Sequence, residues 1–324
     1  MGSPHEVTGE DGALPMDDRN RPRPRGLGIG RTRLLLSIAP ALAVLLVMMT
    51  MLTTPLGGAS TASALRRGPR PSTSTTSTTS TTSTTSTTLA PTTTPSGSVL
   101  LADPFDRPDG LITNEYAFWN PGAADAITDP VWQMTSGSLL ARNGTAWSGR
   151  PDDITPNATS SNGTDSAIFR MVSRRRDRAS VSVSFLLRRD GFTTTPSTPA
   201  VAWDGEHVLL RYRSETSLYA VSFDRRDGTT AIKKKVTGGT SNGGTYYTLA
   251  SGTDTFTSGV FHRVSTSILD TTDGSVTIRL MVDGVELLSA TDDGVGGPVI
   301  PSGGIGLRAD NADVSLDDLV VTTH

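Results

Sequence analysis

Cysteine is absent from the 324-residue chain. Disulfide bonds, thiol nucleophiles and thiolate metal sites are therefore excluded as sources of stability or chemistry. Histidine is scarce as well, with four residues in all, at positions 5, 207, 262 and 324. None of their spacings matches a histidine-based metal motif, so we interpret them as ordinary surface residues.

Glutamate is rare after residue 96, where it occurs only at positions 115, 206, 215 and 286. A retaining glycosidase needs two carboxyl groups about 5 Å apart, and residues at i and i+2 of a strand supply them because they share a face. The nearest such pair is Asp204 and Glu206, in a Trp-Asp-Gly-Glu run that is typical of a turn. We therefore predict no catalytic residue, and the balance favours a binding protein over an enzyme.

Basic residues are outnumbered by acidic ones in the larger part of the chain. Residues 97–324 contain 20 Lys and Arg against 27 Asp and Glu, a net charge of −7, whereas the whole chain carries −3. A surface with this balance repels a phosphate backbone. Nucleic acid is therefore not expected as a partner.

Long uncharged apolar runs are lacking except for one, at residues 34–52. Its 19 residues are long enough to cross most of a bilayer core that is about 30 Å thick. Six arginines precede it, so the positive-inside rule places residues 1–33, a predicted disordered tail, in the cytoplasm. We expect a single-pass membrane helix at 34–54 with the C-terminal part outside the cell. The alternative is a signal segment removed near Ala64, which would leave a secreted protein.

A Ser/Thr-rich segment at residues 55–96 follows the apolar run. Ser-Thr-Thr triplets repeat from residue 74 to residue 88, and Pro91 and Pro95 follow them. Tracts of this composition cannot bury a core and behave as extended stalks. The segment is predicted to hold residues 97–324 away from the membrane.

Residues 97–324 show the pattern of an all-β domain. Apolar residues alternate with polar ones at 180–185, 218–223 and 276–282, which predicts strands that bury one face. Asp-Gly pairs at 190–191, 227–228, 273–274 and 283–284 predict hairpin turns, because both residues tolerate a positive φ. No amphipathic run is long enough for a substantial helix.

Motifs at both ends of this region resemble those of a known superfamily. The runs at 304–310 (Gly-Ile-Gly-Leu-Arg-Ala-Asp) and 314–321 are similar to the closing strands of concanavalin A-like jelly rolls, the laminin-G and glucanase superfamily. Ala-Asp-Pro-Phe-Asp at 102–106 is similar to the opening strand of that superfamily and of the family often called 3-keto-disaccharide hydrolase-like. The resemblance implies a jelly-roll sandwich of two antiparallel sheets over residues 97–324, in which the first and last strands pair.

The resemblance also implies a calcium site. Many sandwiches of this superfamily hold their termini together with calcium, through a carboxylate of the last strand and oxygens near the first. Asp103, Asp106 and Asp317 are the corresponding candidates, and hard oxygen ligands suit the ion. The alternative is that these aspartates form turns or occupy exposed strand positions.

Aromatic residues are few, at 5% of the chain, yet three of the four tryptophans lie between residues 119 and 147. Aromatic faces stack on sugar rings, and amide groups bond to sugar hydroxyls. The candidate carbohydrate-binding residues are Tyr116, Trp119, Asn120, Trp132 and Trp147. The competing interpretation is that the tryptophans fill the core.

Together these features predict a bacterial cell-surface protein. Its domain would bind a polysaccharide or another cell-envelope glycan without catalysis. Two alternatives stay open: a glycoside hydrolase or polysaccharide lyase of the same fold, and a structural adhesion module.

Overall fold

The computed structural model describes residues 97–149, 168–196 and 198–324. The predicted cytoplasmic tail, membrane segment and stalk lie outside the described residues. Among the residues that are described, no helix is long and apolar enough to cross a membrane. The single helix in these ranges is one turn, α1 (Tyr116–Trp119), in keeping with the β pattern of the sequence.

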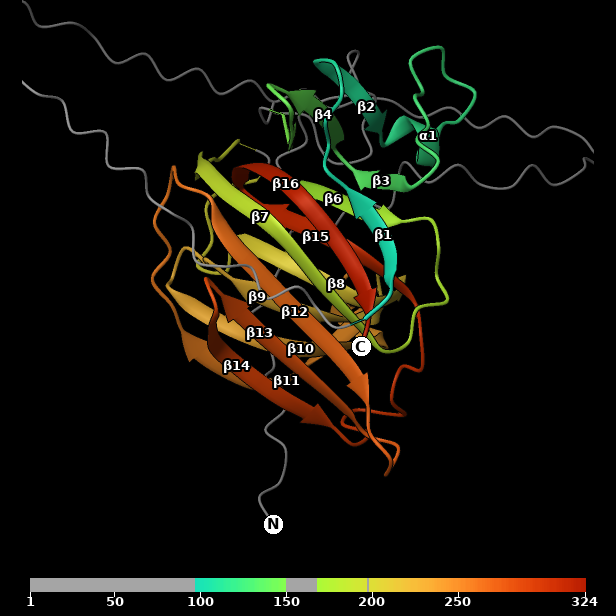
Figure 1. Ribbon diagram of the computed structural model, residues 1–324, viewed down its shortest axis with the longest axis vertical. Helices are drawn as coiled ribbons and strands as arrows, with labels where there is room; N and C mark the ends of the chain where they lie inside the picture. The colour runs from blue at the N-terminus through green and yellow to red at the C-terminus, as the bar shows by residue number, and fades with distance from the viewer. Residues whose placement is uncertain (1–96, 150–167, 197) are drawn as a thin grey trace, which may run out of the picture. The chain divides into compact units, whose positions relative to one another are not determined.

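Two antiparallel sheets form the domain, and they lie one behind the other (Figure 1). Sheet A has nine strands, in the order β14 (Val285–Asp292), β13 (Val276–Val282), β12 (His262–Asp270), β7 (Val181–Phe192), β16 (Ala312–Thr323), β5 (Thr145–Trp147), β4 (Ser138–Arg142) and β2 (Gly110–Asn114), with β1 (Val99–Asp103) also on β16. Sheet B has seven, in the order β11 (Gly244–Thr253), β10 (Thr229–Ser241), β9 (Ser217–Phe223), β8 (Gly205–Ser214), β15 (Gly304–Asp310), β6 (Ile168–Ser173) and β3 (Trp132–Ser136). The predicted all-β sandwich of two antiparallel sheets is confirmed.

Strict alternation of side chains builds the core between the sheets. In β7, Val181, Val183 and Phe185 are buried, whereas the serines between them are half-buried. Successive side chains of a strand point to opposite faces, so the apolar ones meet those of sheet B. Burial of each such side chain contributes about 1.5–3 kcal/mol, which is why the alternation decides the fold.

The first and last strands pair, as the resemblance implied. Residues 99–103 of β1 run antiparallel to residues 319–322 of β16, with a bulge after Val99. This pairing brings the two ends of the domain side by side, and Thr323 also donates its backbone N–H to the carbonyl of Ser98.

Three of the four predicted Asp-Gly turns are confirmed, and one is wrong. The pairs at 227–228, 273–274 and 283–284 close the β9–β10, β12–β13 and β13–β14 hairpins. The pair at 190–191 instead lies within β7, where Asp190 is an extra residue opposite β16. Its carboxylate accepts hydrogen bonds from Arg142 at 2.9 Å and Ser315 at 3.0 Å, so side-chain contacts hold the bulge that replaces the turn.

Candidate functional site

Three of the predicted carbohydrate-binding residues lie together on or beside α1. Tyr116 is buried at the start of the turn, and Asn120 is exposed just after its end. Trp119 is half-buried, packs edge-to-face on Phe118 and donates its indole N–H to the carbonyl of Thr135 at 2.9 Å. The indole polar group is therefore already used within the fold.

The other two tryptophans lie on different sheets. Trp132, on β3, is 0% exposed and stacks on Phe105 in the core, with its indole N–H bonded to Asp103 at 2.8 Å. A sugar needs an accessible aromatic face, which Trp132 does not offer. Trp147, on β5, is half-buried, lies under the guanidinium of Arg142 and donates its N–H to Asp313 at 2.6 Å. The structure does not gather the five candidates on one surface.

The three calcium candidates do not form a donor set that fits the ion. Both oxygens of Asp103 are in use: Oδ1 accepts the backbone N–H of Phe105, and Oδ2 accepts Arg107 and Trp132, each at 2.8 Å. Asp317 carries a raised pKa because of burial and then the negative charges of Asp318 and Asp106. Within the described residues, no group of three or more acidic or histidine side chains is placed to hold a metal.

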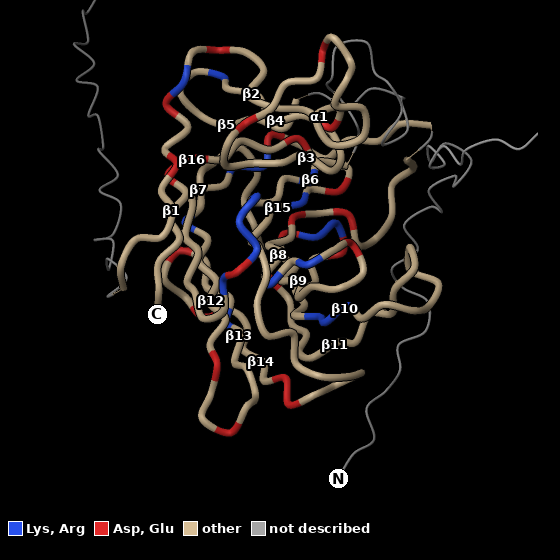
Figure 2. The backbone as a smooth tube through the Cα atoms, turned by 90° about the vertical axis from the view of Figure 1, so that its right-hand side faces the viewer, with Lys and Arg blue, Asp and Glu red and all other residues tan. Residues whose placement is uncertain are grey.

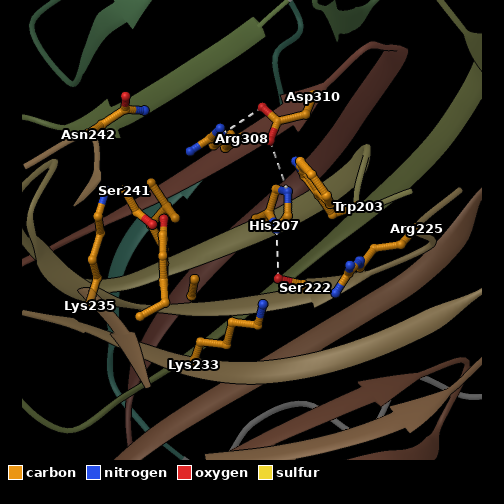
Figure 3. A pocket seen from close by; sticks show the side chains of 13 residues that line it. Trp203, His207, Ser222, Arg225, Lys233, Lys235, Ser241, Asn242, Arg308 and Asp310 are labelled. Atoms are coloured by element: carbon orange, nitrogen blue, oxygen red, sulfur yellow. Dashed lines mark hydrogen bonds and ion pairs between the residues drawn. The ribbon is translucent and has the colours of Figure 1, made fainter. Parts of the chain in front are cut away.

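The described residues form a candidate site, a hollow on the outer face of sheet B, which is the face turned away from sheet A. It contains about 550 Å³ of empty space, including space open to solvent. The lining side chains come from alternate positions of adjacent strands and from three connections: Trp203, His207, Leu209, Ala220, Ser222, Arg225, Lys233, Lys235, Ser241, Asn242, Tyr246, Arg308 and Asp310 (Figure 3). Their neighbours in sequence, such as Val208 and Val221, point into the core. The strands of sheet B therefore fix the floor of the hollow.

Two of these three connections lie on opposite sides of the hollow. Trp203 lies in the turn before β8, and the Asp204 carboxylate holds that turn by accepting the backbone N–H of Val201 and the side chains of Arg226 and Asn311. On the opposite side, the tip of the β10–β11 hairpin contributes Ser241 and Asn242. The hydrogen bonds of Asp204 therefore hold the turn that carries Trp203.

A polar row crosses the floor of the hollow from β9 to β15. His207 Nδ1 lies 2.7 Å from Ser222 Oγ, and His207 Nε2 lies 3.4 Å from Asp310 Oδ2 (Figure 3). Arg308 donates to Asp310 at 2.7 Å. Burial raises the pKa of Asp310, but the charges of Arg308 and His207 outweigh burial and hold it below the ordinary value, so the carboxylate is ionised at neutral pH.

Cationic side chains dominate the hollow. Arg225, Lys233, Lys235 and Arg308 line it, against the single carboxylate of Asp310. The ammonium groups of Lys235 and Lys233 lie 4.8 and 5.9 Å from the centre of the Tyr246 ring. These cation–π contacts hold the two β10 lysines beside the ring on β11. In Figure 2 the Lys and Arg segments of β10 lie on the sheet B side of the sandwich.

A buried acidic cluster lies behind this floor, on the core side of β8. Glu206 is 1% exposed, and Asp224 receives a charged hydrogen bond from Arg189. Burial first, and then the negative charge of Asp224, raises the pKa of Glu206 well above its ordinary value, while burial raises that of Asp224 to about 6. The charged form of Glu206 is therefore disfavoured in the folded domain. The acids at 204 and 206 face away from the hollow and do not form a catalytic pair within it.

Sequence reasoning missed the hollow because its residues are far apart in the chain. The one usable signal was the alternation in β8, β9 and β10, which assigns His207, Ser222 and Lys233 to the faces opposite the apolar residues. Trp203 was interpreted only as part of a turn. A Gly-x-Ser-x-Gly run at 239–243 places Ser241 at a hairpin tip between strands, not on the strand-to-helix turn of a hydrolase nucleophile.

Comparison with known proteins gives no family for the chain. No protein-family model matches it, and no curated protein does. Solved structures are similar in outline at low identity. A carbohydrate-binding module from Bacillus subtilis aligns at 9% identity with a TM-score of 0.41, covering 59% of this chain and 95% of the module. A Bacillus subtilis protein of unknown function with a galectin-like fold aligns at 14% identity with a TM-score of 0.45, and the alignment covers 70% of this chain and 96% of that protein. A legume lectin-like domain from Entamoeba histolytica aligns at 12% identity with a TM-score of 0.36, and the alignment covers 60% of this chain and 90% of that domain.

Proposed function

We propose that the hollow on the outer face of sheet B binds carbohydrate and leaves it unchanged. The carrying observation is that an open hollow on a rigid sheet has two aromatic side chains, Trp203 and Tyr246, among hydroxyl, amide and charged groups. Sugar recognition needs this combination, because a pyranose ring has an apolar face and a rim of hydroxyls. In this proposal the domain has the concanavalin A-like fold and works at the cell surface, with residues 34–54 as its membrane segment.

The chemistry of the floor favours binding over glycoside hydrolysis. Among the described residues that line the hollow, Asp310 is the one carboxylate, and it is ionised and bonded to Arg308. Hydrolysis by two carboxyl groups needs a second acid across the scissile bond. Leu209 and Ala220 provide an apolar floor against which a ring can rest.

The test is binding of the full chain, purified in mild detergent, to immobilised polysaccharides and to a glycan array. We expect saturable binding that loses about tenfold in affinity in the Trp203→Ala variant, because the stacking face is removed. Trp147→Ala is the matched control, since Trp147 lies outside the hollow, and it should bind like the wild type. Absence of binding to every glycan, or equal loss in both variants, would refute the proposal.

A second candidate function rests on one observation, the Ser222–His207–Asp310 row. Ser222 Oγ is in hydrogen-bond contact with a histidine whose other ring nitrogen faces a carboxylate. These residue types in this order are those of a nucleophilic hydrolase, for which an ester substituent of a glycan would be the substrate class. Against it, Asp310 bonds more closely to Arg308, and Ser222 is only 4% exposed.

Labelling with a fluorophosphonate separates the two functions. In a binding module, Ser222 stays unlabelled and no acid or reducing sugar is released from bound glycans. Labelling of the wild type that disappears in Ser222→Ala, with acid released from an acetylated glycan, would establish the hydrolase instead.

A further inference from the structure

The hollow carries an excess of positive charge in a domain that is acidic overall. Residues 97–324 have 20 basic against 27 acidic side chains, yet the hollow has four cationic side chains and one carboxylate. That carboxylate already neutralises Arg308 at 2.7 Å. The local imbalance is opposite in sign to the net charge of the domain, so the hollow favours an anion.

Arg225 provides a second, independent observation. Its side chain is 9% exposed, lines the hollow and forms an ion pair through Nη2 with Asp227 at 3.2 Å. Its Nε, by contrast, is buried and has no hydrogen-bond partner among the described residues. A buried donor without a partner costs roughly 1–3 kcal/mol, so an acceptor that reached this N–H would recover that cost.

The charged ends of Arg225 and Lys233 reach toward Ser222 from two sides (Figure 3). Lys233 comes from β10, and Arg225 from the turn between β9 and β10. Trp203 and Tyr246 line the same hollow. An anionic group between Arg225 and Lys233 would therefore belong to a molecule that also presents a ring to an aromatic face.

We propose that the ligand of this hollow is an anionic saccharide, recognised through a charged substituent between Arg225 and Lys233. This inference rests on the proposed carbohydrate-binding function and adds the substrate class to it. The shared chemistry is a sugar ring bearing a carboxylate, sulfate or phosphate. Guanidinium groups bind such oxyanions through paired N–H donors, and ammonium groups bind them as point charges.

The test compares polygalacturonate with its methyl ester, which keeps the backbone and removes the charge. We expect the full chain to bind the acid form at least about tenfold more tightly. Raising the salt to about 1 M, where the Debye length is about 3 Å, should remove most of that difference. The same binding measurement with dextran sulfate and with a polyol-phosphate polymer, each compared with its uncharged parent polymer, distinguishes a carboxylate ligand from a sulfate or a phosphate.

Variants assign the effect to the hollow. Arg225→Gln and Lys233→Gln should each lower affinity for the acid form at least about tenfold and leave affinity for the methyl ester unchanged, whereas Arg225→Lys should recover part of the loss. The matched control is Arg279→Gln on β13, whose side chain is 55% exposed on the other sheet; it should bind like the wild type. Thermal unfolding of each variant excludes misfolding as the cause.

The outcomes separate failure of this inference from failure of the proposed function. Equal binding of acid and ester, with loss only in Trp203→Ala, would overturn the anionic ligand and leave carbohydrate binding in place. Equal binding of polyglutamate would overturn the saccharide part, since charge alone would then suffice. Unsaturated uronate released from polygalacturonate would overturn binding without catalysis and establish a lyase.

Discussion

Two regions of the domain use charged and aromatic residues in opposite ways. The opening corner, defined here as Asp103, Arg107, Asp129 and Trp132, forms a closed network: Arg107 bonds to both aspartates, and Trp132 bonds to Asp103. The hollow on sheet B has a tryptophan at its rim and more cations than carboxylates. In the opening corner the charged groups and the indole N–H bond to one another within the fold. In the hollow the buried Nε of Arg225 has no hydrogen-bond partner among the described residues.

The difference teaches how to tell a structural cluster from a binding site. Aspartate and tryptophan in the opening segment attract attention in the sequence, yet their hydrogen-bonding capacity is consumed in holding β1 to β3. Asp129 further accepts the backbone N–H groups of Val131 and Trp132 at 2.8 Å. A ligand has nothing to gain there, whereas in the hollow it supplies the missing partner.

The largest effect is expected from Trp132→Ala. The side chain is fully buried, so its loss should lower the free energy of unfolding by about 3–5 kcal/mol through lost burial and the cavity left behind. Urea denaturation of the full chain measures it. A loss below about 1 kcal/mol would mean that the opening corner is not part of the main core.

Arg107→Met should have the next largest effect. It leaves Asp103 and Asp129, with side chains 7% and 8% exposed, without their cation, and the partial exposure of Arg107 limits the loss to about 1–3 kcal/mol. Arg175→Met is the control, because Arg175 and Asp177 form an ion pair that is 63% exposed on both sides, and no measurable change is expected.

Calcium addition or EDTA should leave the melting temperature of the wild type unchanged, because the ion pair with Arg107 occupies the carboxylate that the ion would need. A rise in melting temperature with calcium would contradict this account of the opening corner.

The buried pair behind the hollow predicts a pH dependence. Glu206 and Asp224 have raised pKa values, to about 6 for Asp224, so the folded state binds protons that the unfolded state releases. Their contribution to stability is therefore fully present below about pH 4 and is lost as the pH rises through the raised pKa values, of which that of Asp224 is about 6. Glu206→Gln removes the buried acid and its charge, and at pH 8 it should stabilise the domain by roughly 1–2 kcal/mol.

The comparison with the wild type isolates this pair from carboxylates that have the opposite dependence. Asp273, for example, has a pKa lowered to about 2 by its hydrogen bonds to Thr271 and Ser275. Glu286→Gln serves as the control, since that side chain is 45% exposed and its removal should leave the pH profile of unfolding unchanged. Parallel profiles for wild type and Glu206→Gln would contradict a raised pKa of Glu206.

The fold was largely predictable because alternation is a local property. The strand predicted at 276–282 coincides with β13, and the pairing of first and last strands follows from the motifs at both ends. The turn at Asp190-Gly191 failed because Arg142 and Ser315, distant in sequence, hold Asp190 as a bulge. Long-range contacts of this kind override local turn preference.

The site was not predictable for the same reason. Trp203, Ser222, Lys233 and Arg308 meet because β8, β9, β10 and β15 are neighbours in sheet B, and a single sequence does not state the order of strands. Aromatic density along the chain instead drew attention to residues 116–147. There Trp132 entered the core, which composition alone does not distinguish from a surface.

Among the tryptophan variants the smaller loss of stability is expected from Trp203→Ala, and it sharpens the comparison most. Trp203 is half-buried in a turn that Asp204 holds independently of the indole ring, so the free energy of unfolding should fall by no more than about 1 kcal/mol. Trp132→Ala and Trp203→Ala each remove one indole side chain. Urea denaturation and glycan binding, measured for both variants, should separate the structural tryptophan from the binding one. If Trp203→Ala cost as much stability as Trp132→Ala, the indole ring would be part of the core and the rim of the hollow would lose its stacking face.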